Sequence, residues 1–174
     1  WNQRSKIYPK QIRIRKFSIM IVFRIEREKY LKTSLSGIGA SMTEGYRWNS
    51  LNTRIVYTAD SRALATLEVS VHLDLSEDLP TDRFYVEIEI PDEITIQEVH
   101  LNDLPTEWSS KPPILITQTI GDDFVYYNDA AVLKVPSAVV PEEFNYLINP
   151  NHEDASKIKI VSTKKMAFDS RIKQ

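Results

Sequence analysis

RFYVEIEI, residues 83–90, is the most regular stretch of this sequence. Its apolar residues alternate with polar or charged ones, and Pro91-Asp92 follows it directly. Such alternation sets one face of a β-strand against a core and leaves the other in water. These residues therefore predict a half-buried strand.

Further strand-like and helix-like segments lie on both sides of this strand. Runs rich in β-branched and aromatic residues predict further strands at residues 21–25, 54–58, 94–99, 145–150 and 157–161. Helices are expected at residues 62–73 and 114–127, the second interrupted by Gly121. Many strands with a few short helices, and no internal repeats, predict one compact α+β domain with a mixed β-sheet core.

The helix expected at residues 62–73 carries an unusual acid. Asp60 or Ser61 can cap it, and Glu68 lies on or beside an apolar face that is expected to hold Leu64, Leu67 and Val71. A carboxylate among apolar side chains costs several kcal/mol unless it is paired or protonated, so Glu68 is a candidate functional acid. The alternative is that it lies in water at the rim of the helix.

Glycine is concentrated in one window. Three of the 4 glycines, Gly37, Gly39 and Gly45, lie just before Arg47. Glycine allows positive φ and close approach of a ligand to the backbone, and an arginine fork is suited to a phosphate or carboxylate. The window therefore indicates either an anion-binding pocket or a chain turn.

The composition argues against a membrane-spanning protein and against a transition-metal site. The 174 residues suit one domain, and the apolar runs are too short to cross a bilayer. There is no cysteine, and the 3 histidines are widely separated, so no transition-metal site is expected and the cytoplasm is the expected compartment.

Charge is distributed unevenly along the chain. Residues 1–19 hold six of the 22 basic residues and no acid, which leaves 16 basic against 24 acidic residues in the rest, a formal charge of −8. A domain with this negative charge is a poor general nucleic-acid binder. We interpret residues 1–19 as a basic appendage and residues 20–174 as the domain.

A serine and several asparagines remain ambiguous. Ser137 follows a proline and lacks the flanking glycines of a hydrolase nucleophile elbow, so it is either a ligand hydrogen-bond donor or a turn residue. Asn49, Asn145 and Asn149 suit turns as well as ligand binding, and His152 is expected to be exposed.

Several blocks occur in an order that resembles the RES domain, a family named for its arginine, glutamate and serine. From residue 21 to residue 171 the blocks are Phe23-Arg24, Gly37-x-Gly39-Ala40, Gly45-Tyr46-Arg47-Trp48-Asn49, Val56-Tyr57-Thr58-Ala59, Ala63-x-Ala65-x-x-Glu68, Val135-Pro136-Ser137-Ala138-Val139-Val140 and Asn145-Tyr146-Leu147-Ile148-Asn149-Pro150-x-His152. The main departure is Tyr46, where the family usually has a second glycine.

The resemblance implies a toxin of a bacterial toxin–antitoxin pair with an ADP-ribosyltransferase-like fold. Such a toxin would degrade NAD by phosphorolysis or hydrolysis, or transfer ADP-ribose to a protein. It would be neutralised in a hetero-oligomer by a cognate Xre-type antitoxin. NAD would be a substrate, inorganic phosphate a possible co-substrate, and no metal, membrane or nucleic acid would be needed.

The same resemblance assigns roles to particular residues. The catalytic set would be Arg47, Tyr57, Glu68 and Ser137, and the substrate-binding set Arg24, Gly39, Asn49 and Asn149. Cleavage of the nicotinamide N-glycosidic bond passes through an oxocarbenium-like state, which a fixed carboxylate such as Glu68 stabilises. Arg47 would hold a phosphate, Tyr57 would contact the ribose, and Ser137 would donate to a phosphate or ribose oxygen. A non-catalytic binding module that uses the glycine window as a scaffold is the alternative from another class.

Overall fold

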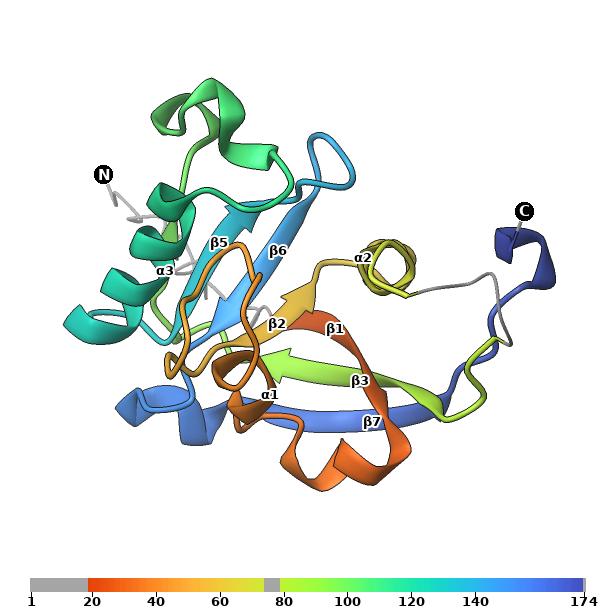
Figure 1. Ribbon diagram of the computed structural model, residues 1–174. Coiled ribbons are helices and arrows are strands. Elements are labelled where there is room, and N and C mark those ends of the chain that lie inside the picture. The colour runs from red at the N-terminus through yellow and green to blue at the C-terminus, as the bar shows by residue number, and fades with distance from the viewer. Residues whose placement is uncertain (1–18, 74–78, 174) are drawn as a thin grey trace, which may run out of the picture.

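One seven-stranded sheet forms the centre of the molecule (Figure 1). The computed structural model describes residues 19–73 and 79–173. The strands are β1 (Met20–Arg27), β2 (Val56–Ala59), β3 (Arg83–Ile90), β4 (Ile96–Glu98), β5 (Val132–Pro136), β6 (Phe144–Ile148) and β7 (Lys159–Lys165). The α-helices are α1 (Ile38–Ser41), α2 (Arg62–Ser70) and α3 (Leu115–Tyr127). Short 3-10 turns are η1 (Glu28–Thr33), η2 (Leu101–Asp103), η3 (Thr106–Ser109), η4 (Glu153–Lys157) and η5 (Ser170–Lys173).

The strands follow the order β4-β5-β6-β2-β1-β3-β7, so chain neighbours are often not sheet neighbours. β4 and β5 are parallel, and every other neighbouring pair is antiparallel. The sheet is therefore mixed, and the expected α+β class is confirmed. The stretch that predicted a half-buried strand is β3, which pairs with β1 over its full length.

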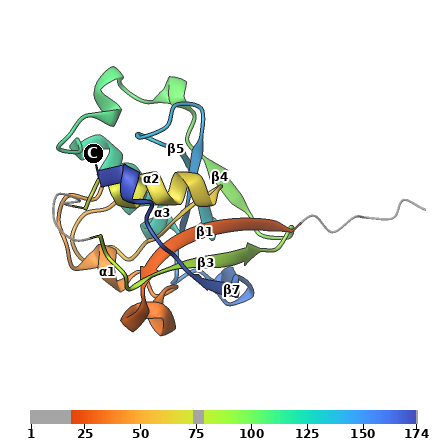
Figure 2. The same ribbon diagram turned by 90° about the vertical axis from the view of Figure 1, so that its right-hand side faces the viewer.

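Alternating side chains divide the core between the two faces of the sheet. One face is covered by α2 and α3, which pack on two neighbouring apolar clusters. The α2 cluster includes Ile25, Ala59 and Leu64, and the α3 cluster includes Val135 and Leu147. The other face carries a third cluster, which includes Val22, Val56, Val86 and Ile148. In Figure 2, α2 runs across the sheet beside β1, with the C-terminal segment next to it.

The structure corrects the predicted face of α2. Leu64 and Ala65 are buried, whereas Leu67 and Val71 are 44% and 46% exposed. The helix ends at Ser70 rather than at residue 73, and Ser61 caps it by accepting a hydrogen bond from Leu64 N at 3.0 Å. The inward stripe is therefore 61, 64, 65 and 68, so Glu68 continues the buried side of the helix.

Gly121 does not interrupt α3, contrary to the expectation. A Cβ atom there would lie 1.7 Å from the carbonyl oxygen of Trp48. Glycine therefore lets the backbone of α3 contact the backbone of Trp48. On the same helical face, Gln118 donates to the carbonyl of Tyr46 at 3.0 Å, and Asp122 accepts from the backbone N–H of Ser50 at 3.0 Å. α3 thus holds residues 46–50 against the sheet.

The expected basic appendage, residues 1–19, lies outside the described residues except for Ile19. Among the residues described, no helix is both long enough and apolar enough to cross a membrane.

Candidate active site

The site lies on the helix-covered face of the sheet, at the boundary between the α2 and α3 clusters. Asn145 of β6 marks this boundary, because it pairs with Ala59 of β2 on one side and with Val135 of β5 on the other. Ala59 belongs to the α2 cluster and Val135 to the α3 cluster. Polar groups that reach this point are therefore bordered by apolar side chains on both sides.

Glu68 projects from α2 into this boundary and is partly buried. Its Oε1 accepts a hydrogen bond from Ser137 Oγ at 2.9 Å and another from Asn145 Nδ2 at 2.6 Å. The partner that a half-buried carboxylate requires is thus supplied by two neutral donors. The interpretation of Glu68 as a freely hydrated rim residue does not fit this geometry.

Ser137 is a fixed donor. It is buried in the turn after β5, and its Oγ accepts hydrogen bonds from the backbone N–H groups of Val139 and Val140, both at 3.1 Å. A hydroxyl has two acceptor lone pairs and one hydrogen, so these two contacts direct the hydrogen toward Glu68. The hydroxyl therefore orients the carboxylate.

Arg47 lies in the segment that α3 holds. Its terminal nitrogens donate to the carbonyl oxygens of Trp108, Ser109 and Ser110, the last two at 3.2 and 3.1 Å. Burial lowers the pKa of Arg47, while the negative charge of Glu68 acts in the opposite direction. Its contacts with the described residues use three of its five N–H donors, so two are left for an anion within this part of the chain.

Tyr57 connects β2 with the Arg47 segment. Its hydroxyl donates to Asn49 Oδ1 at 2.7 Å and accepts from Trp48 N at 3.2 Å. Burial raises the pKa of Tyr57, so the hydroxyl stays protonated at neutral pH. The Tyr46 ring lies 5.0 Å from the Tyr57 ring, centroid to centroid, and the guanidinium of Arg47 lies over the Trp108 ring, 5.7 Å from its centroid.

Asn49 is buried and holds the glycine window in place. Its Nδ2 donates to the carbonyl oxygens of Ala40, Ser50 and Thr53 at 3.0, 3.0 and 3.3 Å. Because its Oδ1 accepts from Tyr57, this one side chain fixes both the window and the tyrosine. Within the window Gly37 and Gly45 have φ of 66° and 91°, values that favour glycine.

The structure does not bring the remaining predicted residues to Glu68. Arg24 alternates with Phe23 and Ile25 of the α2 cluster, so it lies on the opposite face of the sheet, where it pairs with Glu26 at 2.9 Å. Gly39 is exposed in α1. Asn149 is fully buried just beyond β6, about 13 Å along the strand from Asn145.

Asn145 is the functional candidate that sequence reasoning left ambiguous. In β6 it shares a side of the strand with buried Leu147, so an amide stands where the α2 and α3 clusters meet. The signal that could have identified Asn145 is a polar residue at a strand position whose side chain points toward the core.

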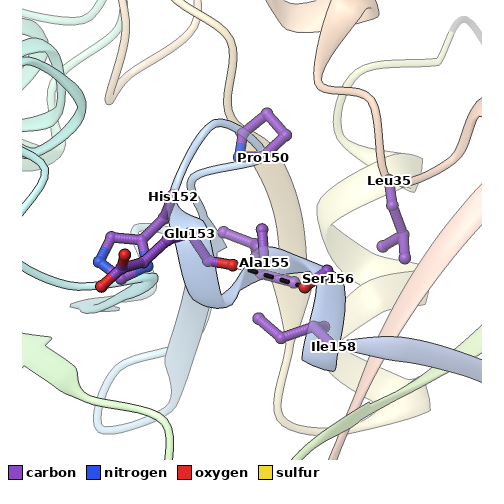
Figure 3. Close-up of a pocket in the computed structure, with 8 residues that line it drawn as sticks. Leu35, Pro150, His152, Glu153, Ala155, Ser156 and Ile158 are labelled. Carbon is purple, nitrogen blue, oxygen red and sulfur yellow. Dashed lines mark hydrogen bonds between the residues drawn. The ribbon is translucent and has the colours of Figure 1, made fainter.

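A separate cavity lies away from this cluster. Figure 3 shows it beside η4, and it measures about 300 Å³. Its walls include Leu35, Ile148 and Ile158, which pack on or beside the third core cluster, on the other face of the sheet. None of the residues bonded to Glu68 lines it. Among the described residues, no group of three His, Cys, Asp or Glu side chains could hold a metal ion.

The family model of the RES domain matches residues 21–169 of this sequence. The chain belongs to the RES-domain family. The Prs ADP-ribosylating toxin of Sphingobium sp. (strain YBL2) is 43% identical over 145 residues, which are 82% of this chain and 89% of that protein. A protein named Toxin Res from Photorhabdus laumondii is 37% identical over 88% of this chain and 97% of its own length.

The fold of this RES domain is also found in a solved toxin–antitoxin complex. A chain in the crystal structure of the M. tuberculosis MbcT–MbcA complex superposes with a TM-score of 0.69, covering 87% of this chain and 86% of that chain. The sequences are only 14% identical, so this likeness speaks for the fold. It agrees with the mixed sheet and few helices described above.

Proposed function

We propose that this chain is the toxin of a toxin–antitoxin pair and that it cleaves the bond between nicotinamide and ribose in NAD. The observation that carries this proposal is the anchored carboxylate of Glu68, held by Ser137 and Asn145 in a RES domain. The names of the curated relatives, which are toxins, support the same function.

The chemistry requires little more than a well-placed negative charge. The bond between ribose C1′ and the pyridinium nitrogen breaks, its electron pair leaves with nicotinamide, and positive charge spreads over C1′ and the ring oxygen. A fixed carboxylate stabilises this developing cation, and the leaving nicotinamide is neutral, so no acid has to protonate it. Glu68 takes this role.

Arg47 and the aromatic pair position the dinucleotide. The two N–H donors that Arg47 keeps are one on Nε and one on Nη1, so each can donate to a separate oxygen of the NAD pyrophosphate or of an incoming inorganic phosphate. The hydroxyl of Tyr57 already donates to Asn49, so Tyr57 would contact NAD with the face of its ring, next to Tyr46.

The acceptor decides the product. Attack by inorganic phosphate on C1′ gives ADP-ribose phosphorylated at that carbon, and attack by water gives ADP-ribose with release of a proton. Attack by a protein side chain would leave ADP-ribose on that protein. The last reaction is the second candidate, because a relative with 43% identity is named as an ADP-ribosylating toxin.

The test is the fate of NAD with the isolated chain, with and without inorganic phosphate, followed by mass spectrometry. A phosphorylated product that requires phosphate identifies phosphorolysis, and free ADP-ribose in both samples identifies hydrolysis. Parallel reactions with labelled NAD and a bacterial lysate report the second candidate, in which the label stays on protein. An intact NAD pool and unlabelled protein would contradict an NAD-cleaving enzyme and favour a binding module.

The proposed partner is a cognate antitoxin of the Xre type. The formal charge of −8 from residue 20 onward favours a partner that presents basic side chains. Co-expression should yield a complex that elutes as one species and consumes NAD more slowly than the isolated chain does.

A further inference from the structure

The two donors on Glu68 share one of its oxygens. Ser137 Oγ and Asn145 Nδ2 both donate to Oε1, and no side chain or backbone N–H among the described residues donates to Oε2. The final torsion of a glutamate is broad and roughly two-fold, so an unrestrained carboxylate would rotate freely. Two donors on Oε1 fix the rotation and leave Oε2 available to a ligand.

Asn145 is suited to set this direction because its backbone is rigid. It lies in β6 between two paired strands, opposite Ala59 and Val135. The Ser137 hydroxyl, by contrast, is carried by the turn after β5. The shorter of the two hydrogen bonds, 2.6 Å, is the one from the strand.

We propose that Asn145 is a positioning residue of this site: it holds Oε1 of Glu68 so that Oε2 faces the ribose carbon at which NAD is cleaved. This inference rests on the proposed function. Asn145 acts through Glu68, so its removal lowers the rate of the chemical step more than it weakens NAD binding. Misplacing a reacting group by about 1 Å costs on the order of 100-fold in rate.

The first test is Asn145→Ala, with the exposed Asn102→Ala as the matched control. We expect kcat to fall by about 10- to 100-fold with a change in KM for NAD of less than about threefold. Asn102→Ala should keep both constants. Thermal unfolding of each variant gives the folded fraction, to which the rates are normalised.

Asn145→Asp separates positioning from a general structural role. At neutral pH it sets a second carboxylate against Glu68, so kcat should fall further than in Asn145→Ala. As the pH falls, the two carboxyl groups come to share one proton, which restores both the donor and the single negative charge of the natural pair. The deficit of Asn145→Asp should therefore shrink as the pH decreases, whereas that of Asn145→Ala stays constant.

If the unaltered chain turns over NAD but Asn145→Ala keeps kcat within about threefold, Asn145 does not position Glu68, and the proposed function stands. An Asn145→Asp deficit that is independent of pH and equal to that of Asn145→Ala would also overturn the inference. If the unaltered chain leaves NAD intact, the proposed function fails and this inference fails with it.

Discussion

Two asparagines at opposite ends of β6 show how differently one side chain is used. Asn145 donates to the carboxylate of Glu68 at the boundary between the α2 and α3 clusters. Asn149 is fully buried, donates to Asn128 Oδ1 at 2.7 Å and accepts from Asn151 N at 3.0 Å. The amide near Glu68 orients a charged group, whereas the other closes a loop. Burial alone therefore does not identify a site, and the chemistry of the bonded partner does.

The largest effect is expected for Glu68 of α2, whose carboxylate accepts the hydrogen bond from Asn145. Expression of the unaltered chain without an antitoxin should arrest growth and deplete cellular NAD, whereas Glu68→Gln should do neither because it lacks the negative charge. Glu93→Gln, at an exposed turn, is the control and should remain toxic. If Glu68→Gln is still toxic, neither the carboxylate of Glu68 nor its hydrogen bond with Asn145 is needed for toxicity.

A large effect is also expected at the contact between α3 and the Arg47 segment. Gly121→Ala would force the helix away from the Trp48 carbonyl, and overpacking of this kind costs about 1–3 kcal/mol or more. Gly39→Ala is the matched control, because no atom beyond its chain neighbours and the adjacent helix backbone lies within 4 Å of the added methyl group. Thermal unfolding should separate the two variants, and equal stability would contradict the close packing of α3.

Asn149→Ala tests the asparagine at the other end of β6. The free energy of unfolding should fall by about 1–3 kcal/mol, because Asn128 Oδ1 and Asn151 N lose their partner. Turnover of NAD per folded molecule should stay within about twofold, since Asn149 lies about 13 Å from Asn145. Denaturant unfolding and normalised rates measure both quantities. A selective loss of NAD affinity would instead support the role that the sequence suggested for Asn149.

The smallest effect is expected for Tyr57→Phe. It removes the hydroxyl between Trp48 N and Asn49 but keeps the ring, so the free energy of unfolding should fall by about 1–2 kcal/mol. The rate should drop by no more than about tenfold, the equivalent of one hydrogen bond. Tyr126→Phe, with the residue 81% exposed, controls for loss of a hydroxyl. A rate loss as large as that of Glu68→Gln would give the hydroxyl itself a catalytic role.

Much of the fold could be predicted because its signals are local. Alternation identified β3, and of the two predicted capping residues, Asp60 and Ser61, it is Ser61 that caps α2. The inward face of α2 was predicted wrongly, because Leu67 and Val71 have the right spacing but point to solvent. The tertiary contacts of Leu64 and Ala65 decide that face, and spacing does not contain them.

The candidate site was predictable only in part. Glu68 was recognisable as an acid on an apolar helix, and its pairing with Ser137 joins two residues that the resemblance had selected. Asn145 was missed as a specific candidate because its role depends on the strand order β5-β6-β2, which brings together segments far apart in the chain. Arg24 was included with the substrate-binding residues through the family resemblance, and sequence order does not show which face of β1 it occupies.

The catalytic role of Glu68 is tested by the release of nicotinamide from NAD by the unaltered chain and by Glu68→Gln, at equal concentrations of folded protein. We predict steady release by the unaltered chain and a rate lower by about 100- to 1,000-fold for the variant, the usual cost of removing one preorganised electrostatic group. Equal rates in the two proteins, or no release by the unaltered chain, would contradict this role.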